Sequence, residues 1–205
     1  MVNTPINQNS DNRALRNPAK RRRWAFWIPL ALQLGLILMA PARAIYTHTT
    51  GEAVLLQTAP VDPYDLLRGY YVILNYQISA TDTLEALPGW SDLEAAEQQQ
   101  NRPVYVILAP PQEPGRQPWS PVAVSRDRPQ LDSDQVALRG TYQWGRVVYG
   151  LERYYIPEDQ RLEINERISE QQRREPEGYL VEVKVDSTGQ SVPVSLWVGE
   201  KNYRF

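Results

Sequence analysis

The chain has 205 residues, with 22 Lys or Arg and 24 Asp or Glu, no cysteine and a single histidine. Disulfides, thiolate catalysis and metal sites that need several Cys or His ligands are therefore excluded. Residues 1–44 contain seven of the basic residues and one of the acidic residues, so residues 45–205 carry a net charge of −8. This negative charge argues against nucleic-acid binding, because binding to phosphates requires a basic surface.

The N-terminal region predicts a tail followed by a membrane anchor. Residues 1–23 are polar, lack periodicity and end in a basic cluster, which indicates a disordered cytoplasmic tail. Residues 24–42 carry no charge, and a helix of that length spans roughly 28 Å, close to the thickness of a bilayer core. We therefore predict a single-pass transmembrane helix over 24–44. Gln33 is a candidate for packing against another helix within the membrane, although a single span also tolerates one amide.

The charge distribution predicts the orientation of this anchor. The basic cluster precedes the apolar segment, so the N-terminus is expected in the cytoplasm and residues 45–205 outside it. The segment also resembles a cleaved signal peptide, because Ala42-Arg43-Ala44 has the A-x-A form of a cleavage site. The length of the apolar segment favours an uncleaved anchor in the cytoplasmic or an internal membrane. Both interpretations place residues 45–205 on the same side.

Residues 45–205 are predicted to form a mainly β domain, an antiparallel sheet or barrel-like fold with one or two short helices. Apolar runs and alternating patterns predict the strands 53–58, 69–79, 104–108, 119–125, 136–142, 147–149, 179–186 and 190–198. The last two strands form a hairpin around a Ser-Thr-Gly turn. Residues 91–100 are predicted as a short helix after a Ser N-cap, and 158–173 as a charged helix lying on the sheet. Within 69–79, the core face is expected to hold Val72, Leu74, Tyr76 and Ile78.

Two segments concentrate chemically useful side chains. In the first, Asp65 and Arg68 are three residues apart and can pair across a turn that leads into the strand. The second runs from Gly150 to Glu158, and its Glu152, Arg153 and two tyrosines form a set that can bind an anion or a sugar. In both segments the alternative is a polar network that only fixes the local structure. The candidate ligand or interaction residues are Asp65, Arg68, Tyr71, Tyr76, Glu152, Arg153 and Tyr154.

The sequence offers no recognisable catalytic set. His48 has no predicted partner, and the body contains two lysines, Lys184 and Lys201. No phosphate-binding loop or metal-binding helix motif is present. We therefore predict no catalytic residue, no metal and no cofactor.

Residues 69–76, Gly-Tyr-Tyr-Val-Ile-Leu-Asn-Tyr, resemble the signature of the GDYXXLXY family of bacterial membrane proteins, which is common in cyanobacteria. Gly69, Tyr71, Leu74 and Tyr76 match the signature, whereas Tyr70 replaces its Asp. The upstream Pro-Val-Asp-Pro segment with Arg68, and the stretch 150–157, are similar to the family as well. The resemblance implies an anchored extracytoplasmic protein of unknown function, encoded near multi-pass membrane proteins, and it brings no catalytic residues.

These observations favour a non-enzymatic accessory or interaction protein, anchored in the lipid bilayer, whose β domain docks onto a multi-pass membrane partner or an envelope component. The alternative is an envelope hydrolase that uses carboxylates on glycan or peptide, which requires acids that converge in a cleft. A protease of the signal-peptidase type is disfavoured, because no Ser follows the span in the required motif and no Lys is placed to pair with it.

Overall fold

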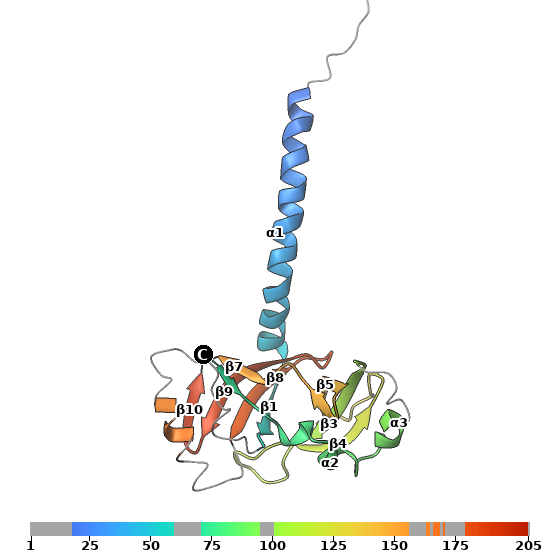
Figure 1. Ribbon diagram of the computed structural model, residues 1–205, viewed down its shortest axis with the longest axis vertical. Coiled ribbons are helices and arrows are strands. Elements are labelled where there is room, and N and C mark those ends of the chain that lie inside the picture. The colour runs from blue at the N-terminus through green and yellow to red at the C-terminus, as the bar shows by residue number, and fades with distance from the viewer. Residues whose placement is uncertain are drawn as a thin grey trace, which may run out of the picture. The chain divides into compact units, whose positions relative to one another are not determined.

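The computed structural model describes residues 18–59, 71–94, 101–155, 163–164, 166–168, 170 and 179–204. The chain divides into two compact units, Met1–Ala42 and Arg43–Phe205. The first unit contains most of helix α1 (Pro18–Thr50), and the second contains its last two turns and the β-strands (Figure 1). The strand-rich unit is called the β unit below.

Helix α1 confirms the predicted apolar helix. Apart from the half-buried Leu30, its large apolar side chains from Trp24 to Met39 are between 51 % and 69 % exposed, so nothing in the described chain covers them. The stretch Trp24–Thr50 has a mean hydropathy of 1.8 over its most apolar window and is long enough to cross a membrane. Length and composition therefore make α1 a candidate transmembrane helix.

The helix continues beyond the predicted boundary at Ala44 and ends at Thr50. The run Ile45–Thr50 is rich in Thr, which is a weak helix former. The threonine hydroxyls instead bond back to helix carbonyls one turn earlier, from Thr49 to Ile45 and from Thr50 to Tyr46. The body of the domain therefore begins with helix rather than with extended chain.

The first sheet of the β unit joins the two ends of its sequence. Strands β1 (Glu52–Gln57), β8 (Leu180–Val185), β9 (Ser191–Val198) and β10 (Lys201–Arg204) lie in the order β1-β8-β9-β10, and all pairs are antiparallel. The predicted terminal hairpin is confirmed as β8–β9. Strand β10, which the sequence analysis missed, pairs with β9 from Lys201 to Arg204.

The second sheet is formed by the middle of the chain. Strands β3 (Pro103–Ala109), β4 (Ser120–Ser125), β5 (Val136–Gln143) and β6 (Arg146–Val148) lie in the order β4-β3-β5-β6. All of its pairs are antiparallel.

A two-stranded ribbon of β2 (Tyr71–Ile73) and β7 (Arg153–Tyr155) completes the described strands. The prediction of a mainly β, antiparallel domain is confirmed. Its barrel-like form is not, because the described sheets remain separate and none closes on itself.

One short helical element replaces the end of the predicted strand 69–79, and two more come after it. The strand ends at Ile73, and η1 (Gln77–Ser79), α2 (Thr81–Leu84) and α3 (Trp90–Glu94) follow. The predicted core face is nonetheless right for Leu74, Tyr76 and Ile78, which are all buried. The alternation of buried and more exposed side chains continues past Ile73, because Tyr76 still pairs with Thr58 as an isolated bridge before η1 begins. The predicted helix 91–100 is present to Glu94, and its remainder lies outside the described residues.

The core draws on strands of both four-stranded sheets. The inward residues of β1, β3 and β8 alternate with half-buried ones, as expected for strands with one face in the core. Residues 163–164, 166–168 and 170 are helical. Ile164 and Ile168, one turn apart, are 0 % and 1 % exposed and belong to the core cluster. This part of the predicted helix 158–173 therefore packs one face on the core.

Candidate functional site

The two candidate segments, about eighty residues apart in sequence, meet in the ribbon β2–β7. Tyr71 pairs with Tyr155, Val72 with Tyr154, and Ile73 with Arg153. Of the candidate residues, Tyr71 and Tyr154 thus hold strand positions in the same ribbon, and Arg153 has an exposed side chain. Asp65 and Arg68 lie outside the described residues.

Glu152 closes the turn that leads into β7. Its Oε1 accepts a hydrogen bond of 2.6 Å from the backbone N–H of Tyr149, across a turn in which Gly150 has a φ of +80°. Its own carbonyl accepts a bond of 2.8 Å from the N–H of Leu74. The carboxylate and the backbone of Glu152 therefore both fix the junction between the turn and the ribbon.

Two buried phenols secure the same junction. Tyr76 is 1 % exposed, and its hydroxyl donates to the carbonyl of Leu151 at 2.9 Å. The hydroxyl of Tyr149 donates to the carbonyl of Ile78 at 2.5 Å. Burial, assisted by the negative charge of Glu152, raises the pKa of Tyr149 well above its ordinary value. Both phenols act here as neutral hydrogen-bond donors.

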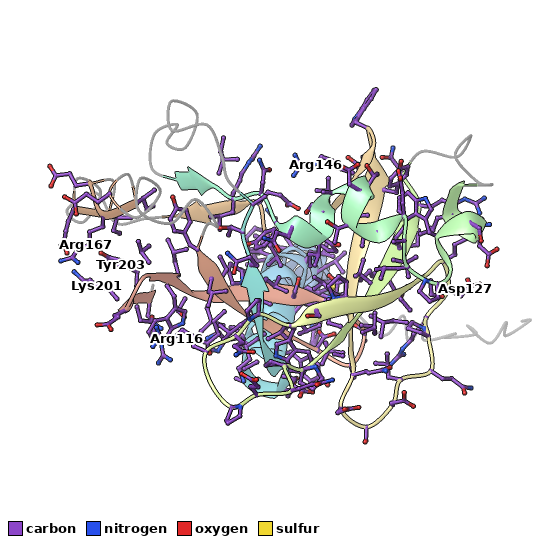
Figure 2. The ribbon with its side chains drawn as sticks, turned by 90° about the horizontal axis from the view of Figure 1, so that it is seen from below. Arg116, Asp127, Arg146, Arg167, Lys201 and Tyr203 are labelled. Carbon is purple, nitrogen blue, oxygen red and sulfur yellow. The ribbon has the colours of Figure 1, made fainter. Side chains whose placement is uncertain are left out.

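Arg146 adds a cation to this region. It extends from β6 (Figure 2), and its Nη2 donates to Oδ1 of Asn75 at 2.9 Å. The backbones of Arg146 and Ala80 also form an isolated bridge. The sequence analysis missed Arg146, Asn75 and Tyr149. Asn75 was visible as a polar residue within the signature, whereas nothing in the sequence connects Arg146 with it.

A second polar cluster lies where the end of α1 meets the hairpin β8–β9. The hydroxyl of Thr47, which is 1 % exposed, donates to Oδ2 of Asp186 at 2.6 Å. Oδ1 of Asp186 accepts bonds from the N–H and the hydroxyl of Thr188 and from the N–H of Gln190. Burial alone would raise the pKa of Asp186, but these hydrogen bonds from Thr188, Thr47 and Gln190 outweigh burial and lower it.

Comparison with known families decides the identity of the chain. The family model described as GDYXXLXY protein matches residues 33–196. The chain belongs to the GDYXXLXY family. Comparisons with curated proteins and with solved structures gave no significant match.

The geometry gives part of the GDYXXLXY signature a structural role. Leu74 and Tyr76 are both 1 % exposed and belong to the core cluster. The matched region contains the ribbon, the turn at Gly150 and the part of α1 that begins at Gln33. Both candidate segments of this GDYXXLXY protein are thus covered by the match.

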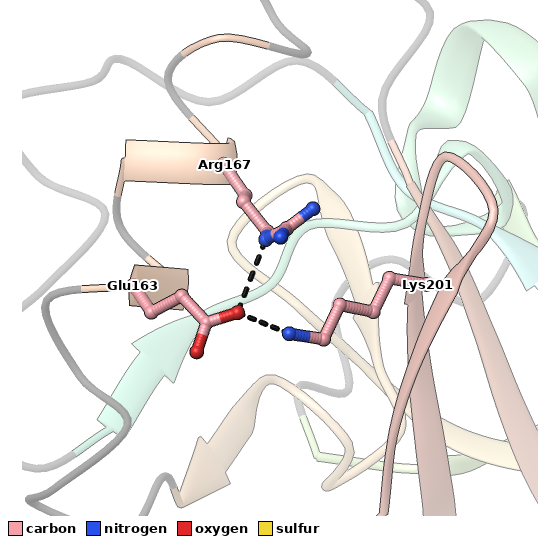
Figure 3. Close-up of polar contacts among 3 residues, drawn as sticks. All are labelled: Glu163, Arg167 and Lys201. Carbon is pink, nitrogen blue, oxygen red and sulfur yellow. Dashed lines mark hydrogen bonds and ion pairs between the residues drawn. The ribbon is translucent and has the colours of Figure 1, made fainter.

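An exposed charge cluster lies elsewhere on the β unit of the GDYXXLXY protein. Glu163 accepts hydrogen bonds from Arg167, at 3.2 Å, and from Lys201 (Figure 3). The hydrogen bond from Lys201 lowers the pKa of Glu163, and the same bond raises the pKa of Lys201. The cluster joins the helical segment to β10 on the surface, where solvent screens such pairs.

Two cavities of the β unit lie apart from the candidate residues. One, of about 820 Å³, is lined by Asp92, Arg102, Arg126 and Asp127 among others. The other, of about 430 Å³, includes Arg128 in its lining. No candidate residue is among the described residues that line either cavity. Within the described chain, no three His, Asp or Glu side chains are grouped to hold a metal ion.

Proposed function

We propose that this GDYXXLXY protein is a membrane-anchored accessory protein whose β unit lies outside the cytoplasm and docks onto a multi-pass membrane protein. The observation that carries the proposal is the exposure of the large apolar side chains of α1, at 51–69 % from Trp24 to Met39 for all but Leu30. Such a surface requires either lipid or other apolar helices around it. A single residue, Gly51, separates the end of α1 from β1.

Gln33 supports a protein partner in addition to lipid. It lies within the apolar stretch of α1, and its side chain is exposed in this chain. An amide in hydrocarbon is costly unless it is hydrogen-bonded, and helices in membranes often satisfy such groups across a helix–helix contact. A multi-pass protein provides both the apolar surface and the hydrogen-bonding group.

The candidate residues support an interaction role over catalysis. The carboxylate of Glu152 accepts a backbone hydrogen bond, and the phenol of Tyr76 donates to a backbone carbonyl inside the core. These groups hold the ribbon β2–β7 in place, and the side chain of Arg153 is exposed on it. A satisfied, rigid junction suits a docking surface.

Affinity capture of the full chain from gently solubilised membranes tests the proposal. We expect one multi-pass membrane protein to co-purify in a fixed ratio, and to recover this chain when it is itself captured. The variant Gln33→Leu should reduce the recovery, whereas Leu34→Ile, next to it in α1, should not. A chain that is recovered alone and runs as a monomer would contradict the proposal.

A further inference from the structure

Trp144 occupies an unusual place at the tip of the hairpin β5–β6. Two residues join these strands, Trp144 with a φ of +53° and Gly145 with a φ of +73°, and Gln143 pairs with Arg146 beneath them. Positive φ at both positions is the pattern of a type I′ turn, which favours Asn, Asp or Gly at its first position. A bulky L-residue is strained there, because its Cβ lies too close to the following carbonyl oxygen. Gly145 fits the turn, and Trp144 does not.

The indole of Trp144 gains little from the described part of the chain to offset this strain. It is 85 % exposed, more than any other large apolar side chain of the described residues. Among these residues, no hydrogen bond or ring contact involves it. Trp144 thus violates both the residue preference of the turn and the tendency of large apolar side chains to be buried. A residue that stabilises neither the turn nor the core is a candidate for a functional role.

We propose that Trp144 is the anchor residue through which the β unit binds its membrane protein partner, by insertion of the indole into an apolar pocket of that partner. This inference rests on the proposed function and specifies its contact. Trp is the residue type most enriched at the energetic centre of interfaces, because one rigid ring buries about 150–250 Å². The narrow hairpin presents that ring at its tip, ahead of both strands.

Charge and anchoring favour a protein pocket over lipid. The hairpin residues 141–148 contain one charged side chain, Arg146, and its guanidinium donates to Asn75. The tip therefore lacks the basic side chains that anionic lipid attracts, and a pocket with an uncharged rim complements it. Peripheral binding to a bilayer relies on a broad apolar face with several basic side chains. A single indole lacks that face, and α1 already provides the apolar surface for lipid.

The variant Trp144→Asn tests the inference in the full chain, because Asn fits the turn better than Trp. We expect its thermal stability to equal or exceed that of the wild type, while its capture of the partner falls about 30-fold, as for a hot-spot residue. The matched control is Leu131→Asn, since Leu131 is an exposed loop residue of the same unit, at 42 %, and should leave capture unchanged.

A photo-crosslinking amino acid at the neighbouring position 143, which leaves Trp144 in place, identifies the occupant. Crosslinking to the multi-pass protein that co-purifies with the wild type supports the inference, whereas crosslinking to lipid or to a second copy of this chain overturns it. Equal capture by the wild type and by Trp144→Asn also overturns it but leaves the proposed function standing. If the wild type captures no membrane protein, both the proposed function and the inference fail.

Discussion

The hydroxyl of Thr47 and the carboxylate of Asp186 form a buried hydrogen bond of 2.6 Å between the last turns of α1 and the end of β8. The neighbouring Gly51 is held just as closely, since a Cβ atom there would lie 2.5 Å from the carbonyl oxygen of Thr47. Lys184 donates to the carbonyl of Gly51 at 2.9 Å. The end of the helix is therefore an integral part of the β unit.

Substitution of Thr47 should measure the strength of this attachment. Thr47→Val keeps the shape of the side chain but removes the donor to a buried carboxylate, which should lower the free energy of unfolding by about 1–3 kcal/mol. The control is Thr49→Val, because Thr49 is exposed and bonds within the helix alone. Urea unfolding of the full chain, followed by tryptophan fluorescence, compares the two. Equal losses in both variants would contradict the role of the Thr47–Asp186 bond.

Asp186 should make stability dependent on pH at the acidic end. Its pKa in the folded chain is lowered, so its contribution is fully present above the pKa of the unfolded state and is lost as pH falls through the folded value. Stability should therefore decrease below about pH 4. Asp186→Asn removes this titration, and the gap in melting temperature between the wild type and the variant should narrow on acidification from pH 7. A gap that widens on acidification would refute this assignment.

The phenol of Tyr76 should contribute through its hydroxyl. Tyr76→Phe removes the donor to the carbonyl of Leu151, a buried acceptor, and should cost about 1 kcal/mol in the free energy of unfolding. Tyr46→Phe is the control, because the side chain of Tyr46 is 54 % exposed. Chemical denaturation of both variants provides the measurement. A loss confined to the control would show that the junction at Leu151 does not need this bond.

Alanine substitutions at Gly89 and Gly145 should separate the destabilisation caused by backbone strain from that caused by steric contact. Both have positive φ, at +89° and +73°, so an alanine at either position is strained by about 1–2 kcal/mol. A Cβ at Gly89 would also meet the carbonyl oxygen of Val124 at 2.0 Å, whereas the space around Gly145 is open. Gly89→Ala should therefore destabilise the chain clearly more than Gly145→Ala in thermal unfolding. Similar melting temperatures would disprove the close approach of Gly89 to β4.

The sequence predicts the strands well where a continuous apolar run or apolar alternation coincides with a sheet strand, as in β3, β5, β8 and β9. The strand prediction fails at residues 74–79, where Tyr76 lies in an irregular segment and Ile78 in a 3₁₀ turn. Both side chains are nonetheless buried in the core, as they would be in a strand, so the pattern does not distinguish the two conformations. Apolar alternation in the sequence indicates which side chains are buried, whereas hydrogen bonds to distant segments determine whether the backbone forms a strand.

The same distinction between local sequence pattern and long-range contact applies to the candidate site. The concentration of Glu, Arg and Tyr in residues 150–155 is visible in the sequence, and so is the signature at 69–76. Their pairing in β2–β7 depends on contacts between segments about eighty residues apart, which local patterns do not encode. For the same reason the bonds of Asn75 to Arg146 and of Thr47 to Asp186 were not predicted.

The most direct test of the proposed anchored arrangement is labelling of single cysteines with a membrane-impermeant maleimide, since the native chain contains no cysteine. The variants Asn9→Cys and Asp127→Cys place one thiol before the apolar helix and one on an exposed loop of the β unit. We predict that Asp127→Cys is labelled in intact cells stripped of any outer layer, and that Asn9→Cys, on a chain of full-length mass, is labelled after permeabilisation alone. Labelling of Asn9→Cys in intact cells, with Asp127→Cys protected, would contradict the anchored, extracytoplasmic arrangement.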